Sequence, residues 1–223
     1  SSTLCAKTGL PTLCIEMPIY QDKDQISRAK KHIDKLKKKY TNVCSVEVDL
    51  SNTFDTFKKS LPNDFNDNKE ISLANTKARL RMSTLYYFSA LYGYLVSGTG
   101  NKVEDFGVGF YTKYGDGGVD ISPIADLMKT EVFKVAKKLD VIDEILKAKP
   151  TDGLWDDNRT DVEQIGSSYK DLEWAMNYKS NKVNKSNLSS NQKKALKNYK
   201  KYNKLNQHKM QPIPVCKIPD NFK

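Results

Sequence analysis

Residues 10–50 read LPTLCIEMPIYQDKDQISRAKKHIDKLKKKYTNVCSVEVDL, and the period of their hydrophobic pattern changes twice. Leu10 to Ile19 is a short, mostly apolar run that predicts a strand. Apolar residues recur at helical spacing from Asp22 to Tyr40, which predicts a helix. From Cys44 to Leu50, valines alternate with polar neighbours and predict a second strand. A strand, a helix and a strand in this order form the unit of a parallel sheet.

The same alternation continues toward the middle of the chain. Ser72 to Leu91 predicts a long helix that ends at Gly93, and Tyr94 to Ser97 predicts a third strand. Short connections between such elements indicate the α/β class, a doubly wound parallel sheet covered by helices and Rossmann-like in kind. Ligands of such sheets bind beyond the carboxyl ends of the strands, so we expect the site in the loop after Ser97. Further helices are predicted at Pro123 to Leu139, Val141 to Ala148 and Ser167 to Tyr178.

The composition is that of a globular protein, with 38% apolar and 29% charged residues. Its 223 residues favour one domain with one sizeable core. No run approaches the roughly 18 to 20 apolar residues of a membrane span, and the first residues do not resemble a signal peptide. We therefore expect no membrane association and a cytoplasmic protein.

Four cysteines occur without a CxxC pair and without a histidine at zinc-ligand spacing. A metal cluster is not expected. Cys14 and Cys44 lie in apolar stretches, and we expect the cysteines to be buried, reduced thiols.

The formal net charge of +10 is concentrated in one segment. Residues 179–209 contain ten lysines and no acid, with apolar residues at roughly helical spacing. This pattern favours an exposed, partly amphipathic helix with a solvated face; contact with an anionic substrate at its end, or with nucleic acid, are the alternatives. Only Tyr199 and Tyr202 could stack on bases there, so we expect no nucleic-acid partner.

The segment SGTGNKVEDFGVGFYTKYGDGGVDISPIADLMKT, Ser97 to Thr130, is rich in glycine and charge. Glycines allow positive φ and close approach of the backbone to a ligand, although tight turns alone would also explain them. Turns would not require the charged residues among them. Their chemistry indicates a site for phosphate and a divalent cation. These residues are Glu104, Lys113, Asp116, Asp120 and Lys129.

Two parts of this segment, GTGNKVE at residues 98–104 and GFYTKYGDGGVDISPIADLMKT at residues 109–130, closely resemble the signature of the NAD⁺ synthetase family. The resemblance implies an ATP pyrophosphatase with the adenine nucleotide α-hydrolase-like fold. Further pieces agree in order and spacing: KTGLPT at residues 7–12, NTKARLRM at 75–82, KAKPTDGLW at 147–155 and HK at 208–209.

The resemblance assigns one group of residues to ATP. Thr99, Lys129 and Thr151 match positions that contact ATP, and Gln21 resembles a position near the adenine. Glu104 matches a Mg²⁺ ligand, which suits a hard oxygen donor. Without the resemblance, Glu104 would be an exposed loop charge and Lys129 a solvated lysine early in a helix.

A second group is assigned to the substrate deamido-NAD⁺. Its members carry charges that can bind phosphate, carboxylate or ribose groups, although a helix such as the one with Arg79 commonly exposes arginine to solvent. We expect Lys113, Asp120 and Lys129 to act in catalysis. The substrate-binding residues implied are Arg79, Lys113, Asp120, His208 and Lys209.

The resemblance implies an ammonia-dependent ligase. The nicotinate carboxylate attacks the α-phosphorus of ATP, and ammonia then displaces AMP from the acyl adenylate, giving NAD⁺, AMP and pyrophosphate. The implied partners are deamido-NAD⁺, ATP with Mg²⁺, ammonia and a second copy of the chain in a homodimer. The sequence of the glycine-rich loop resembles that of the short ammonia-using enzymes more than that of the glutamine-using ones.

The sequence departs from the family in two places. The phosphate loop SGGxDS does not occur, and residue 1 follows shortly after the position where that loop would end. We expect the intact protein to carry the loop and its strand, so that residues 1–223 form one NAD synthetase domain without them. Glu16 stands where some relatives have a basic residue near ATP.

Two other functions remain open from the sequence. Another ATP pyrophosphatase, GMP synthetase-like or tRNA-modifying, would share the fold and the glycine-rich loop. A basic nucleic-acid-binding protein would bind RNA with a steep salt dependence.

Overall fold

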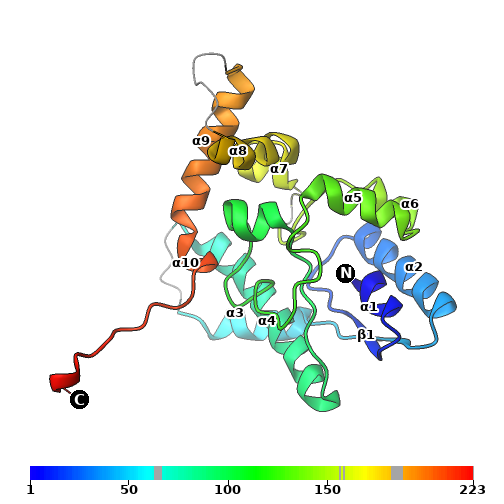
Figure 1. Ribbon diagram of the computed structural model, residues 1–223. Helices are drawn as coiled ribbons and strands as arrows, with labels where there is room; N and C mark the ends of the chain where they lie inside the picture. Colours follow the sequence, from blue (N-terminus) through cyan, green and yellow to red (C-terminus); the bar gives the residue numbers. More distant parts are fainter. Residues whose placement is uncertain (63–66, 156, 158, 182–187, 223) are drawn as a thin grey trace.

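Helices make up most of the chain in the computed structural model, which describes residues 1–62, 67–155, 157, 159–181 and 188–222 (Figure 1). Two short strands form a small parallel sheet beside them. In chain order the elements are α1 (Ser2–Lys7), β1 (Thr12–Glu16), α2 (Lys23–Lys39), β2 (Val43–Glu47), α3 (Ser51–Ser60), α4 (Lys69–Tyr92), the π-helix η1 (Val103–Val108), α5 (Lys129–Lys138), α6 (Asp143–Leu146), α7 (Asp161–Ile165), α8 (Tyr169–Asn181), α9 (Ser190–Leu205), α10 (Gln207–Met210) and the 3₁₀ turn η3 (Asp220–Phe222).

The first strand, helix and strand confirm the prediction from residues 10–50. β1 and β2 pair in parallel, with Thr12 opposite Val43 and Glu16 opposite Glu47. Helix α2 connects them, and its N-terminus is capped by Asp22, whose carboxylate accepts the backbone N–H of Asp24 at 2.8 Å. This parallel unit positions the carboxyl ends of both strands at one edge of the sheet.

The third strand predicted at Tyr94 to Ser97 is wrong in extent. In the described residues this segment forms a single parallel bridge, between Ser97 and Ile121. The backbone of Val96 is engaged by the following loop, because its carbonyl accepts the N–H groups of Asp120 and Ile121 and its N–H donates to Asp120 Oδ2 at 2.8 Å. The segment is therefore held by a loop and an aspartate side chain rather than by a strand ladder.

Other helix predictions hold with shifted boundaries. Helix α4 ends where predicted, at Gly93 in the left-handed conformation with φ 68°. The helix predicted from Pro123 begins only at Lys129, because Met128 has extended backbone and its N–H donates to Glu131 Oε2 at 2.8 Å. Helices α1, α3 and α7 were not predicted, and each is ten residues or shorter.

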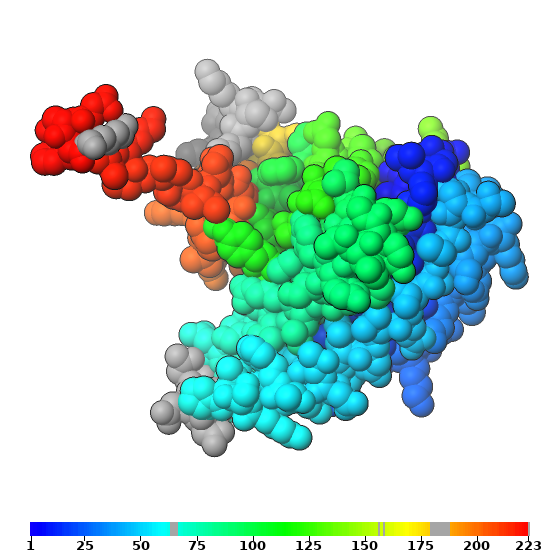
Figure 2. All heavy atoms as spheres, turned by 90° about the horizontal axis from the view of Figure 1, so that it is seen from below, coloured from blue at the N-terminus to red at the C-terminus, as the bar shows by residue number. Residues whose placement is uncertain are grey.

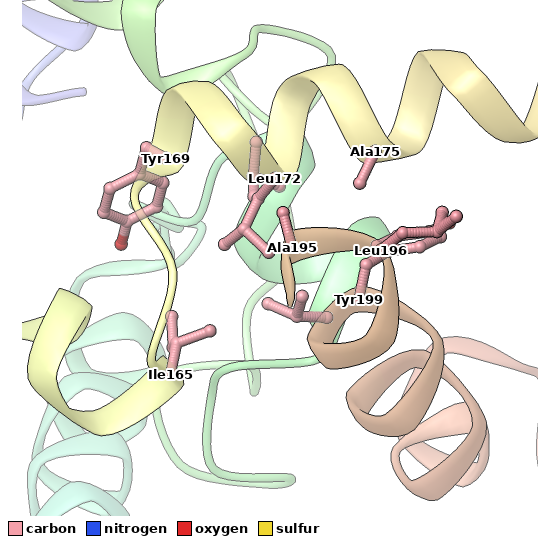
Figure 3. Packing of buried hydrophobic residues seen from close by; sticks show 9 residues of the cluster. Ile165, Tyr169, Leu172, Ala175, Ala195, Leu196 and Tyr199 are labelled. Carbon is pink, nitrogen blue, oxygen red and sulfur yellow. The ribbon is translucent and has the colours of Figure 1, made fainter. Parts of the chain in front are cut away.

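The largest cluster of buried apolar residues joins η1, α7, α8 and α9 (Figure 3). Leu172 and Ala175 of α8 are fully buried against Leu196 and Tyr199 of α9. The lysine-rich helix α9 thus has one apolar face in the core, which confirms the predicted amphipathic pattern. The cluster fixes η1, and with it part of the glycine-rich loop.

The prediction of buried cysteines is wrong for two of the four. Cys44 and Cys216 are exposed, and Cys5 and Cys14 are partly buried; all four are free thiols. Neighbours on a strand point to opposite faces, so burial of Val43 leaves Cys44 on the open side.

Residues after α10 extend away from the body of the molecule (Figure 2). They expose Ile213, Val215, Ile218 and Phe222. Among the helices of the described residues, none has the length and apolar character needed to cross a membrane.

Leu172→Ala tests the importance of the cluster. Leu172 is fully buried, so we expect the free energy of unfolding to fall by about 2–5 kcal/mol, measured by urea denaturation. Leu205→Ala is the matched control on α9, where the side chain is 64% exposed, and it should change stability by less than about 0.5 kcal/mol. Equal losses in the two variants would contradict the assignment of the core.

Candidate active site

A cavity of about 670 Å³ lies at the carboxyl ends of β1 and β2. One side is apolar and is formed by Ile15 and Met17 with Ile26 and Ala29 of α2. Most of the charged lining, which we call the polar end, comes from the glycine-rich segment, the start of α5 and the loop before α7, with Glu104, Asp116, Lys129 and Asp161 among its members. This position is where an open α/β sheet binds its ligands.

All five residues that the sequence assigned to ATP and its cation line this one cavity. They come from segments far apart in the chain: the turn after β1, the loop after Ser97, the first residue of α5 and the loop before α7. Apolar side chains suit a base and polar ones suit phosphates, and the lining of this cavity contains both. The five are Gln21, Thr99, Glu104, Lys129 and Thr151.

Glu104 is the centre of the polar end. Its Oε1 atom accepts hydrogen bonds from Lys129 Nζ at 2.8 Å and from the Tyr169 hydroxyl at 2.6 Å. The Tyr169 hydroxyl also lies 2.6 Å from Asp161 Oδ2. The side chains of Glu104 and Lys129 are 14% and 19% exposed, so this is a mostly buried ion pair. Neither Tyr169 nor Asp161 was predicted.

One hydroxyl proton lies between two carboxyl oxygens in this network. The hydroxyl has one proton and donates to one of them, and the second short contact is a hydrogen bond when that carboxyl is protonated and donates to the hydroxyl oxygen. Burial raises the pKa of Asp161 above its ordinary value, so this carboxyl is protonated more readily than an exposed aspartate. Burial and the two neighbouring carboxylates also raise the pKa of Tyr169, so its hydroxyl keeps its proton.

The backbone of Glu104 is set by Asn101, which is 1% exposed. Asn101 Oδ1 accepts the N–H groups of Val103 at 3.0 Å and Glu104 at 3.3 Å, and so begins the π-helix η1. Such helices are rare and are frequent at functional sites. A Cβ atom at Gly100 would lie 2.2 Å from Asp105 Oδ1, so a larger residue there would displace the Asp105 side chain.

Gln21 is held in place by Arg81, a residue of α4 that the sequence analysis did not assign to the site. Arg81 donates to Gln21 Oε1 at 2.8 Å and to the carbonyl of Met17 at 3.0 Å. Gln21 in turn donates to the carbonyl of Gly153 at 2.8 Å. These contacts connect α4, the end of β1 and the loop with Thr151 around the cavity.

The residues assigned to deamido-NAD⁺ do not line the cavity in the described part of the chain. Arg79 donates twice to the carbonyl of Lys113 at 3.3 Å, and Lys113 Nζ donates to the carbonyl of His208 at 2.7 Å. Lys209 Nζ donates to the carbonyls of Gly109 and Tyr111.

Four of the five assigned residues therefore form one cluster between α4, the glycine-rich loop and α10. Asp120 lies apart from it, between the Tyr86 hydroxyl at 3.0 Å and the N–H of Val96.

Comparison with known proteins supplies the family. Residues 3–213 match the sequence model of the family described as NAD synthase. The chain belongs to the NAD synthase family. The NH(3)-dependent NAD(+) synthetase of Carboxydothermus hydrogenoformans is 39% identical over 163 residues, which are 73% of this chain and 64% of that protein. The protein of the same name from Methanococcoides burtonii is 41% identical over 129 residues, 58% of this chain and 48% of that protein.

The chain thus spans about half to two thirds of the length of these curated relatives. Among solved structures, the NMN synthetase of Francisella tularensis superposes with a TM-score of 0.82 at 29% identity, covering 98% of this chain and 83% of that chain. The NH3-dependent NAD synthetase of Campylobacter jejuni gives a TM-score of 0.69 at 24% identity, with 92% and 78% covered. These likenesses imply the adenine nucleotide α-hydrolase fold.

Members of this family use ATP. Glu104, a carboxylate that lines the cavity, has the chemistry of a Mg²⁺ ligand. The described residues contain no group of three or more His, Cys, Asp or Glu side chains that could hold a metal alone. Mg²⁺ commonly binds one or two carboxylates and takes its other ligands from phosphate and water. Within the described residues, Glu104 Oε2 accepts a long hydrogen bond, 3.4 Å from the N–H of Asn101, so this oxygen has room for a further ligand.

Asp116→Asn tests the electrostatics of the cavity wall. Burial raises the pKa of Asp116, which lines the cavity, above its ordinary value. A carboxyl whose pKa is higher in the folded than in the unfolded protein favours folding while it is protonated. This contribution to the free energy of unfolding is complete below the unfolded pKa and is lost as the pH rises through the folded pKa. We therefore expect the loss of stability of the wild-type protein between about pH 4 and pH 7 to be smaller in Asp116→Asn, measured by urea denaturation at each pH.

Asp126→Asn is the control, because the pKa of Asp126 is shifted in the opposite direction to that of Asp116. The exposed Lys102 lies 2.8 Å from Asp126 and lowers the pKa of its carboxyl, so this group contributes stability above its unfolded pKa that is lost in acid. Parallel pH profiles for the two variants would contradict the account of Asp116.

Proposed function

We propose that the protein catalyses the ATP-dependent amidation of deamido-NAD⁺ by ammonia, giving NAD⁺, AMP and pyrophosphate. The observation that carries this proposal is the single cavity lined by Gln21, Thr99, Glu104, Lys129 and Thr151 in a member of the NAD synthase family. In this proposal residues 1–223 belong to one domain, whose complete sheet is parallel, doubly wound and covered by helices.

ATP would bind with its base against the apolar wall and its phosphates at the polar end. Ile15 and Ala29 offer apolar surface to the base, and the amide of Gln21 lies at the same side of the cavity. Lys129 would face the phosphates, because its ammonium already lies at the polar end beside Glu104. The two ends are set by separate elements, so the nucleotide would be oriented before reaction.

The reaction needs charge neutralisation more than it needs a covalent nucleophile. An oxygen of the nicotinate carboxylate forms a bond to the α-phosphorus, and the bond from that phosphorus to pyrophosphate breaks. Ammonia then attacks the acyl carbon, AMP leaves with the electron pair of the acyl–oxygen bond, and a proton passes to solvent. Lys129 would stabilise the departing pyrophosphate. Mg²⁺, when bound at Glu104, would add positive charge at the phosphates.

The substrate side is proposed to involve a second copy of the chain. Arg79, Lys113, His208 and Lys209 form a cluster outside the cavity, where a long dinucleotide could reach them. The end of α4 and the turn after it expose an apolar patch of Tyr87, Leu91, Tyr92 and Leu95. Exposed apolar patches often mark protein interfaces, which supports a homodimer.

A second candidate substrate is nicotinic acid mononucleotide, which would give NMN. It is favoured by the similarity to the NMN synthetase of Francisella tularensis, which covers 98% of this chain. The separation of the Arg79 cluster from the cavity also suits a shorter substrate that does not reach it. Both substrates carry the same nicotinate carboxylate, so the chemistry of the cavity does not distinguish them.

The proposal is tested by supplying the intact gene product with ATP, Mg²⁺, ammonium and either acid substrate, with products separated by chromatography. We expect equal amounts of AMP and of amidated product, dependent on ammonium. The substrate with the higher kcat/KM identifies the acceptor. AMP formation without an amidated nicotinamide product would contradict both candidates and indicate another acceptor.

Lys129→Met and Glu104→Ala should each lower kcat/KM by about 100-fold or more, because each removes charge stabilisation at the polar end. Lys102→Met is the matched control. Lys102 lies in the same loop, is 39% exposed and pairs with Asp126, so its loss should change kcat/KM by less than about twofold. Equal effects at Lys102 and Lys129 would contradict the assigned role.

Leu91→Asp tests the homodimer. Leu91 is 56% exposed, and a charge there should oppose burial in an interface. We expect sedimentation velocity to give a dimer for the wild type and a monomer for Leu91→Asp at micromolar concentration. Leu205→Asp, on the 64% exposed residue of α9, should remain dimeric. A monomeric wild type would contradict the proposal.

A further inference from the structure

Tyr169 lies behind Glu104 and is not itself part of the cavity lining in the described residues. It is the first residue of α8 and is 8% exposed. Figure 3 shows its ring at the edge of the buried cluster, with Leu172 beside it. Because the ring is held by packing, the hydroxyl is presented to Glu104 from a fixed position.

Lys129 has a partner for its ammonium group in this structure and another in the proposed reaction. It donates to Glu104 at 2.8 Å, and its Nζ lies 4.7 Å from the centre of the Tyr169 ring. In the proposed reaction it also faces the phosphates of ATP. When it turns toward them, Glu104 loses a charged partner while its side chain is only 14% exposed. A mostly buried carboxylate without a sufficient partner is costly.

We propose that Tyr169 and Asp161 are positioning residues that hold Glu104 in place when Lys129 turns from the carboxylate to the phosphates of ATP. The inference rests on the proposed function. The Tyr169 hydroxyl lies 2.6 Å from Glu104 Oε1, so Glu104 would keep this hydrogen bond after Lys129 has turned away, and its Oε2 would stay available to a cation.

Asp161 supports this arrangement from the other side of the hydroxyl. It is 5% exposed, and its Oδ2 lies 2.6 Å from the hydroxyl of Tyr169. Its backbone N–H donates to the carbonyl of Pro150 at 3.1 Å, next to Thr151. Thr151 Oγ1 donates to the carbonyl of Arg159 at 2.8 Å. Asp161 thus connects the loop of Thr151 to the carboxylate of Glu104.

The test is Tyr169→Phe in the intact gene product, which keeps the ring and removes the hydroxyl. Isothermal titration calorimetry would measure the affinity for ATP with Mg²⁺, for ATP without Mg²⁺, and for adenosine. We expect the affinity for ATP with Mg²⁺ to fall about 10- to 100-fold, the range for a lost hydrogen bond to a charged group. Affinity for adenosine should change less than about twofold, because adenosine brings neither phosphate nor cation.

Tyr199→Phe is the matched control, since Tyr199 is 6% exposed in the same cluster and its change also removes one hydroxyl. It should leave all three affinities within about twofold of the wild type. Asp161→Ala, which removes the contact with the Tyr169 hydroxyl whatever the protonation of the carboxyl, should lower the affinity for ATP with Mg²⁺ in the same direction as Tyr169→Phe, and it supplies the measurement if Tyr169→Phe does not fold.

Two results would overturn the inference. In the first, Tyr169→Phe retains the wild-type affinity for ATP with Mg²⁺. In the second, its affinities for adenosine and for ATP fall together, which is the result of a purely structural role. A wild-type protein that binds no ATP with Mg²⁺ would instead refute the proposed function, and the inference with it, before any variant is compared.

Discussion

A carboxylate that is mostly withdrawn from water needs partners, and the arrangement of the cavity follows from this requirement at Glu104. Its partners come from two helices, Lys129 of α5 and Tyr169 of α8, while Asn101 sets its backbone. Helix α8 is fixed in turn by the apolar face of α9. The lysine-rich helix α9 therefore contributes to the site through packing, although none of its described residues lines the cavity.

Much of the architecture could be predicted because it depends on local pattern. The period of the apolar residues identified β1, α2 and β2, and Gly93 marked the end of α4. Tyr94 to Ser97 was predicted as a strand because its residues are apolar, yet backbone pairing depends on which segment lies alongside. Here that segment is a loop, and the carboxylate of Asp120 occupies the N–H that a strand ladder would use.

The candidate site also contains some residues that the sequence identifies and others that only the folded structure identifies. The residues that the resemblance assigned to ATP and its cation line one cavity, whereas Lys113 and Asp120 of the glycine-rich segment lie outside it. Tyr169, Asp161 and Arg81 were missed because each acts through a contact with a residue at least eight positions away in sequence. A tyrosine at the start of a helix and an arginine in an amphipathic pattern have ordinary structural explanations. Only the distances in the folded chain distinguish them from neighbours of the same type.

The exposed thiols of Cys44 and Cys216 lie on two different parts of the molecule, one on β2 and one on the segment that projects beyond α10 (Figure 1). Accessible thiols react with maleimide reagents far faster than buried ones. The native sequence therefore supplies one attachment point on the sheet and one on the projecting segment. A donor and an acceptor fluorophore attached to these two thiols would allow the distance between the two parts to be measured by energy transfer, without the introduction of any new residue.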